Sequence, residues 1–459
     1  MRKLTTGSIM LYAAPLAAVL LFLLLRHAGV EYVIAATAAI TLLTATWWVT
    51  ETIPIPATSL IPFFAFPLAN VLTHREAAAG LGSPVILLLM GGFMLARSLE
   101  RAGVHKRFAL AILHAVGGSG KRIVFAFMLT AALLSMWISN TATTLILIPI
   151  ALAVLKQVED KTLAIAVVLG LAHASSLGGV ATLIGTPPNI IFAGVYTEFT
   201  GLEYSFLDWM KIGLPVVLCG LPLMALWLTR NVTWKETLDL PAAAPWQVNE
   251  VRVLAVFGIT IALWITRAEP LGGWSGLLGT PHVGDATVAL AAVTAMFILP
   301  SGKGDNLLDW KTAVDIPWGM LLLFASGITI AKAFASSGLA ELIAQQLVVL
   351  AGFPLPLLLL CICLGVTFLT EITSNTATTT LLMPILAATA LAVGVSPELM
   401  MIPAAMSASC AFMLPVATVP NAIVFGTGHV TIREMVRGGF VLNLILAVVI
   451  TVVCYLALV

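Results

Sequence analysis

The stretch Ser139-Asn140-Thr141-Ala142-Thr143-Thr144 occurs twice in this chain. Its second copy, Ser374-Asn375-Thr376-Ala377-Thr378-Thr379, lies 235 residues later (374 − 139). A proline follows each copy at the same distance, at Pro149 and Pro384, and both copies lie within strongly apolar sequence. Polar groups inside apolar segments are costly to bury without partners. Two such stretches at one spacing therefore indicate an internal duplication.

A second pair of short phrases follows the first pair along the chain. Gly185-Thr186-Pro187-Pro188-Asn189 corresponds to Ala417-Thr418-Val419-Pro420-Asn421, which lies 232 residues later (417 − 185). The offset falls from 235 to 232 because the second half lacks three residues between the two marks. Upstream, Gly103 and Gly338 keep the offset of 235. The chain thus consists of two related halves.

The composition predicts a membrane protein. Hydrophobic residues make up 60% of the 459 residues and charged residues only 9%, whereas soluble proteins have about 45–50% and about 25%. The net charge of +1 gives no indication of a nucleic-acid partner. The five cysteines lie in apolar runs without metal-site spacing, and no catalytic motif is present, so we predict neither a disulfide framework nor an enzyme.

Apolar runs of about 20 residues predict an all-α polytopic protein with about 11 transmembrane helices. The first lies within residues 1–30, and we prefer a membrane helix to a signal peptide there because no small-residue cleavage site follows it. Segments 123–155 and 354–394 are also apolar, but a Ser-Asn-Thr phrase divides each into short halves, which predicts two re-entrant hairpins. The expected spans are 9–25, 31–50, 56–73, 83–100, 162–198, 209–229, 251–266, 283–300, 316–335, 398–428 and 436–457.

The distribution of basic residues orients these segments. With a cytoplasmic N-terminus, all but five of the 22 lysines and arginines fall on the cytoplasmic side. The first hairpin then opens to the cytoplasm and the second to the outside, so residues 31–229 and 251–459 form two inverted-topology repeats, as in many secondary transporters. Residues 230–250 are the predicted cytoplasmic linker. We expect a multi-pass protein of the cell inner (plasma) membrane.

The four polar phrases predict a binding site at the membrane midplane. Helix ends that meet there offer carbonyl oxygens to hard cations and N–H groups to anions, and Ser, Thr and Asn side chains add neutral oxygens and donors. Small polar residues that only pack helices are the alternative for a single phrase, but four phrases at symmetric positions favour a site. None of the phrases contains Lys or Arg. A bound anion would then be neutralised by helix ends and co-bound cations, which favours a cation-coupled symporter.

These phrases, together with residues 47–54 (Trp-Trp-Val-Thr-Glu-Thr-Ile-Pro), resemble the divalent anion–sodium symporter family over nearly the whole chain. The resemblance implies an elevator-type transporter, a homodimer in the lipid bilayer, that imports C4-dicarboxylates such as succinate, malate and fumarate with sodium. A dicarboxylate exchanger and a citrate or sulfate transporter of the same fold are the alternatives. An anion channel and a membrane-embedded hydrolase are rivals from other classes.

The resemblance also implies ligands for at least two Na⁺ sites and for the substrate. Ser135 and Thr370 are 235 residues apart, so the duplication pairs them independently, whereas Val419 stands where many relatives have proline. Glu371 adjoins the second phrase, and we interpret it as a capping or interhelical hydrogen-bonding group rather than a cation ligand. The implied sodium ligands are Ser135, Ser139, Asn140 and Gly185 in one site and Thr370, Ser374, Asn375 and Ala417 in the other. The implied substrate contacts are Asn140, Thr141, Thr186, Asn375, Thr376 and Thr418.

Overall fold

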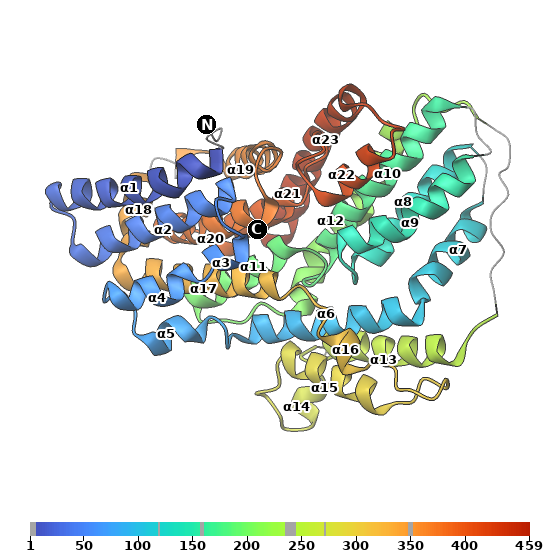
Figure 1. Ribbon diagram of the computed structural model, residues 1–459, viewed down its shortest axis with the longest axis horizontal. Coiled ribbons are helices and arrows are strands. Elements are labelled where there is room, and N and C mark those ends of the chain that lie inside the picture. Colours follow the sequence, from blue (N-terminus) through green and yellow to red (C-terminus); the bar gives the residue numbers. More distant parts are fainter. Residues whose placement is uncertain (1–5, 118–119, 157–159, 235–244, 270–271, 348–351) are drawn as a thin grey trace.

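The computed structural model describes residues 6–117, 120–156, 160–234, 245–269, 272–347 and 352–459. Within these ranges the regular structure is helical, and the predicted all-α architecture is confirmed (Figure 1). Residues 235–244, the centre of the predicted linker, lie outside the described residues.

The two halves of the chain contribute corresponding series of helices. The first half contains α1 (Thr6–His27), α2 (Tyr32–Thr50), α3 (Ile55–Thr58), α4 (Ile61–Leu68), α5 (His74–Ala79), α6 (Pro84–Ala102), α7 (Val104–Val116), α8 (Gly120–Ser135), α9 (Asn140–Leu155), α10 (Lys161–Gly178), the 3₁₀ turn η1 (Gly179–Ala181), α11 (Pro187–Thr200) and α12 (Phe206–Leu228). The second half contains α13 (Val248–Ile265), α14 (Gly273–Leu277), α15 (Asp285–Ile298), α16 (Trp310–Ala313), α17 (Trp318–Ser337), α18 (Leu339–Leu347), α19 (Leu355–Thr370), α20 (Asn375–Ala392), α21 (Pro397–Ala408), α22 (Val419–Gly426) and α23 (Ile432–Leu458).

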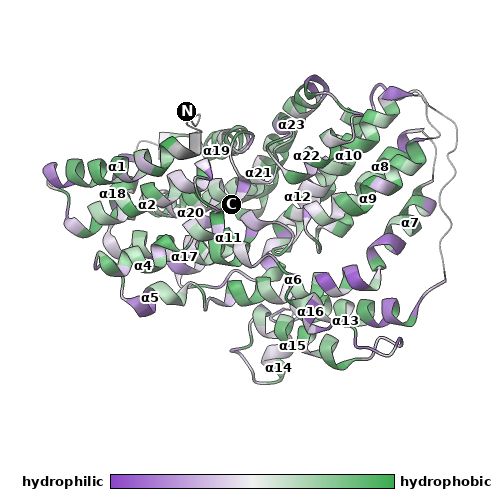
Figure 2. Ribbon diagram, viewed as in Figure 1, coloured by the Kyte–Doolittle hydropathy of each residue, from purple (hydrophilic) through white to green (hydrophobic). Residues whose placement is uncertain are grey.

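The helices are long and apolar enough for a multi-pass membrane protein. Nine candidate spans occur among the described residues, together with shorter apolar helices such as α9, α15 and α19. Figure 2 shows hydrophobic colour along most helices and hydrophilic colour at several helix ends, including the junction of α6 with α7. The multi-pass membrane character is therefore confirmed, whereas the count of 11 spans stays a prediction.

Each Ser-Asn-Thr phrase divides an apolar segment into two helices. The helix α8 ends at Ser135 and α9 begins at Asn140, while α19 ends at Thr370 and α20 begins at Asn375. The two members of each pair pack against one another. Ser139 caps α9 by accepting a hydrogen bond from the N–H of Ala142 (3.2 Å). The structure thus contains two helical hairpins broken at the predicted points, and their re-entrant path through a membrane stays a prediction.

One expected span has a different structure. Residues 56–73 do not form a continuous helix, because α3 ends at Thr58 and α4 begins at Ile61. Pro62 lies in the first turn of α4, and its ring nitrogen has no hydrogen with which to continue the ladder from α3. The Ser59 hydroxyl at the break accepts a hydrogen bond from Trp48 Nε1 (3.1 Å), which fixes the break against α2.

The halves also bend at corresponding glycines. Gly103 ends α6 with φ +79°, and Gly338 ends α17 with φ +82°. The amphipathic helices α7 and α18 begin at the next residue in each case. The left-handed backbone at these positions suits glycine, which has no Cβ to oppose it. The duplication recognised in the sequence therefore reappears in backbone geometry.

We predict that Gly103→Ala and Gly338→Ala each destabilise the protein by about 1–2 kcal/mol, because an L-residue in the left-handed region incurs that cost. Thermal unfolding in detergent would measure the loss. Gly365→Ala is the matched control, because Gly365 lies inside α19 and open space surrounds its missing Cβ. Equal melting temperatures for all three variants would contradict the assignment of these bends to backbone conformation.

Candidate functional site

A cavity of about 730 Å³ lies where the tips of the two hairpins meet. The helices α9, α11, α20 and α22 all begin at its wall. Ser135 and Thr370 lie behind this wall and are fully buried. The structure therefore brings together residues from four sequence phrases, although their roles stay predictions. The lining includes Asn140, Thr141, Thr186, Asn375, Thr376 and Thr418, together with Ser139, Ser374, Gly185 and Ala417.

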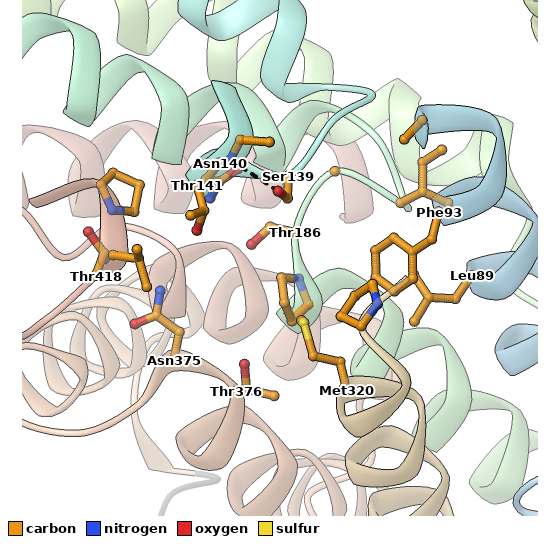
Figure 3. Close-up of a pocket in the computed structure, with 18 of the residues that line it drawn as sticks. Leu89, Phe93, Ser139, Asn140, Thr141, Thr186, Met320, Asn375, Thr376 and Thr418 are labelled. Atoms are coloured by element: carbon orange, nitrogen blue, oxygen red, sulfur yellow. Dashed lines mark hydrogen bonds between the residues drawn. The ribbon is translucent and has the colours of Figure 1, made fainter. Parts of the chain in front are cut away.

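The cavity has one polar side and one apolar side. Figure 3 shows the Asn and Thr side chains of the tips on one side and Leu89, Phe93 and Met320 on the other. The apolar residues come from α6 and α17, which occupy corresponding places in the two halves. A ligand in this cavity would therefore find hydrogen-bonding groups at the tips and an apolar wall opposite them.

Helix N-termini give the polar side a positive potential. Thr186 precedes α11 and Thr418 precedes α22, while Asn140 and Asn375 are the first residues of α9 and α20. Unpaired N–H groups in a first helical turn favour an anion, and the helix dipole adds to this preference. Arg97 is the basic residue among the lining side chains that the structure describes, and it pairs with Glu100 and Asp315. The tips can therefore attract a carboxylate without a neighbouring basic side chain.

The two hairpin tips share the same hydrogen bond. The Ser135 hydroxyl donates to Asn140 Oδ1 (2.6 Å), and the Thr370 hydroxyl donates to Asn375 Oδ1 (3.1 Å). Each tip thus places a hydroxyl oxygen and an amide oxygen side by side. Both oxygens are neutral and hard, as ligands of small hard cations must be.

The first of these oxygen pairs fits a cation together with a backbone carbonyl. A Cβ placed on Gly179 would lie 2.7 Å from Asn140 Oδ1 and 3.0 Å from the carbonyl oxygen of Gly185. Two oxygens from different elements therefore converge on one point beside Gly179, with Ser135 Oγ next to one of them. This donor set fits a small hard cation such as Na⁺. In the other half, Thr370, Asn375 and Ala417 hold the corresponding places.

A matched pair of asparagines holds the unwound segments that supply these carbonyls. Asn189 Nδ2 donates to the carbonyl oxygens of Gly179 (3.0 Å) and Thr182 (2.7 Å). Asn421 Nδ2 donates to those of Ala411 and Leu414, both at 3.0 Å. Both asparagines are fully buried. The sequence phrases ended on these residues, but no role was predicted for them; their shared offset of 232 was the signal available (421 − 189).

Glu371 makes the second half different from the first. Its carboxylate is buried and accepts four hydrogen bonds, which confirms its interpretation as an interhelical hydrogen-bonding group. The corresponding residue of the first half is Met136, whose backbone carbonyl accepts a hydrogen bond from Thr182 Oγ1. The donors to Glu371 are the N–H groups of Phe412 (2.7 Å), Met413 (2.9 Å) and Leu414 (3.0 Å) and the Nδ2 of Asn443 (2.8 Å).

Asn443 was missed in the sequence, although a signal was present. It is the polar amide in the apolar run 436–457, and a polar residue in such a run indicates a partner within the protein. Through Glu371 it connects α23 to residues 412–414, which lead directly to Ala417 and Thr418 at the cavity.

We predict that Glu371→Gln destabilises the protein by about 2–3 kcal/mol, because hydrogen bonds to an ionised group are each of that order and the glutamine NH₂ cannot accept. The melting temperature should fall both with and without sodium. Met136→Leu at the corresponding position is the control and should cost less than about 1.5 kcal/mol, as a volume-conserving change. An unchanged melting temperature for Glu371→Gln would show that the four bonds do not stabilise the fold.

Comparison with known proteins follows this geometry. A family model described as "Citrate transporter" matches residues 45–401. The sodium-dependent dicarboxylate transporter SdcS of Staphylococcus saprophyticus is 43% identical over 443 residues, covering 91% of this chain and 85% of the relative. The protein of the same name from Staphylococcus aureus strain USA300 is 40% identical, covering 91% of this chain and 84% of the relative.

A solved structure supports the fold at lower similarity. The crystal structure of the YdaH transporter of Alcanivorax borkumensis superposes with a TM-score of 0.61 at 19% identity, covering 83% of this chain and 86% of that one. At this identity the likeness concerns the fold alone. The family match and the staphylococcal relatives extend over most of the chain. This chain therefore belongs to the citrate transporter family of membrane transporters, which confirms the predicted resemblance to the divalent anion–sodium symporters and excludes an enzyme.

Proposed function

We propose that this protein imports C4-dicarboxylates such as succinate, malate and fumarate together with sodium. The observation that carries this proposal is the pair of matched tips, each with a hydroxyl oxygen beside an amide oxygen, on a cavity wall formed by helix N-termini. The names of the staphylococcal relatives support sodium dependence and a dicarboxylate substrate.

The tip asparagines can couple the cation to the anion. In each tip the amide oxygen faces the hydroxyl of Ser135 or Thr370. The amide nitrogen of the same side chain is then available to donate to a substrate carboxylate. Sodium supplies the positive charge that the neutral side chains lack, and one asparagine contacts both ligands. We therefore expect at least two sodium ions, one behind each tip.

The apolar wall favours a C4-dicarboxylate over a tricarboxylate. The two carboxylates of succinate can reach the two tips, Asn140 with Thr141 and Asn375 with Thr376, while its methylene groups face Leu89, Phe93 and Met320 (Figure 3). A third carboxylate would face this wall, and burying an unpaired charge there is unfavourable. Citrate is the second candidate because the matching family model carries that description.

The arrangement of the cavity supports an elevator movement. Its polar side comes from the hairpins with α11 and α22, and its apolar side comes from α6 and α17. We infer that the first group slides past the second and carries the ligands with it. Arg97, Glu100 and Asp315 line the predicted cytoplasmic end, so this conformation is inward-open. The inverted repeats 31–229 and 251–459, the cytoplasmic N-terminus, the inner-membrane location and the homodimer belong to the same proposal.

We predict that succinate enters proteoliposomes under an inward sodium gradient and not under an equal potassium gradient. Asn140→Ala and Asn375→Ala should each lower the apparent affinity for sodium by about 10- to 100-fold, since each removes a buried amide that contacts both ligands. Asn231→Ala, at an exposed residue outside the cavity, is the control. Uptake that requires only succinate inside the vesicles would show an exchanger, and inhibition by citrate with citrate uptake would favour the second candidate.

We predict that Gly179→Ala removes one sodium site selectively, because its Cβ would occupy the point on which Asn140 Oδ1 and the Gly185 carbonyl converge. Sodium activation of uptake should become less steep and shift to higher concentration. Gly426→Ala, where open space surrounds the missing Cβ, is the control. An unchanged sodium curve for Gly179→Ala, with normal folding, would place the first cation elsewhere.

A further inference from the structure

Two arginines lie together at one end of α12 and α23, the final helices of the two halves. These helices pack against one another, and Trp227 Nε1 joins them by donating to the carbonyl oxygen of Gly438 (3.1 Å). The guanidinium carbon of Arg230 lies 3.4 Å from the centroid of the Trp227 ring. Arg437 adjoins Gly438 along α23. The tryptophan therefore brings the two guanidinium groups to the same junction.

The positive charge at this junction lacks a carboxylate partner within the described part of the chain. The ion pairs found there include neither Arg230 nor Arg437. Glu434, the acid on α23, pairs with Lys161 (3.1 Å) and caps its own helix at Thr431. Partial burial and then the charge of Arg437 lower the pKa of Arg230. Two like charges held in proximity favour a bound anion.

Exposed apolar side chains extend from the arginines along both helices. On α23, Phe440 and Leu444 follow Arg437 at spacings of three and seven residues and are 44% and 38% exposed. On α12, Leu226 and Leu223 precede Arg230 at spacings of four and seven residues and are 68% and 40% exposed. Residues at these spacings share one face of a helix. Each arginine is thus followed by an apolar stripe that points away from the protein core.

We propose that Arg230 and Arg437 bind the phosphate of an anionic phospholipid whose acyl chains lie along Phe440 and Leu444 and along Leu226 and Leu223. Arginine forks match phosphate geometry, and basic pockets between membrane helices on the cytoplasmic side bind anionic headgroups. The distribution of basic residues places this end of both helices at the cytoplasmic leaflet. A free phosphate would satisfy the arginines alone, so the two apolar stripes decide for a lipid.

This lipid site is separate from the transport site. The residues that line the substrate cavity come from neither α12 nor α23. The proposal therefore does not depend on sodium coupling or on the identity of the substrate, and its failure would leave the transport proposal intact.

The test measures binding of phosphatidylglycerol to the purified full-length protein by native mass spectrometry, with phosphatidylcholine as the neutral competitor. The double variant Arg230→Gln/Arg437→Gln should bind phosphatidylglycerol about 25-fold more weakly, because each arginine near an anionic surface contributes about fivefold. The matched control Lys121→Gln/Arg122→Gln removes the same charge from exposed residues at the start of α8, on the same predicted face, and should change binding less than about twofold.

A second variant separates the site from folding and from surface charge. Arg230→Lys/Arg437→Lys keeps both charges and should lose only part of the affinity, because lysine cannot form the bidentate fork. Equal losses in the glutamine variant and the Lys121/Arg122 control would overturn the proposal, since surface attraction alone would then explain binding. Equal binding of phosphatidylglycerol and phosphatidylcholine would also overturn it, as would displacement of the lipid by millimolar inorganic phosphate.

Discussion

The structure depends on how the backbone groups freed at four helix breaks are satisfied inside an apolar protein. A break in a membrane helix leaves N–H and C=O groups without helical partners, and each unsatisfied group costs several kcal/mol where water is absent. The protein supplies partners from buried side chains. Asn189 and Asn421 bind two carbonyls each, and Glu371 binds three N–H groups. These few side chains give the unwound segments a single shape, and that shape positions the cavity wall.

The two halves solve the same problem with different chemistry. In the first half, the hydroxyl of Thr182 reaches the carbonyl of Met136. In the second half, a carboxylate at the corresponding place collects N–H groups from the chain and the amide of Asn443. A carboxylate binds more strongly than a hydroxyl, and it adds a negative charge behind one tip only. The two cation sites are therefore related by sequence but lie in different electrostatic surroundings, so they need not bind sodium equally.

The sequence predicted the tips well because the duplication marked the same residues twice. Ser135 and Thr370 were paired by their offset alone, and the structure gives them the same hydrogen bond. The break between α3 and α4 was missed, because Pro62 reads equally well as the first turn of a helix or as the end of one. The apolar wall was missed as well, since Leu89 and Met320 cannot be told from lipid-facing residues by type. Glu371 required a partner 72 residues away, which no local pattern reveals.

Neutral ligands at the tips make coupling a matter of charge. An arginine at the tips would hold a dicarboxylate whether or not sodium were bound, and the loaded site would then cross an apolar boundary without its cation. The lining side chains at the tips are uncharged, so a dianion alone leaves its charge opposed only by helix dipoles, which screen it incompletely. Moving that charge past the wall of Leu89 and Phe93 is costly, whereas a dianion with sodium is closer to neutral. The absence of basic residues from the four phrases is thus the feature by which the proposed site would enforce joint movement of anion and cation.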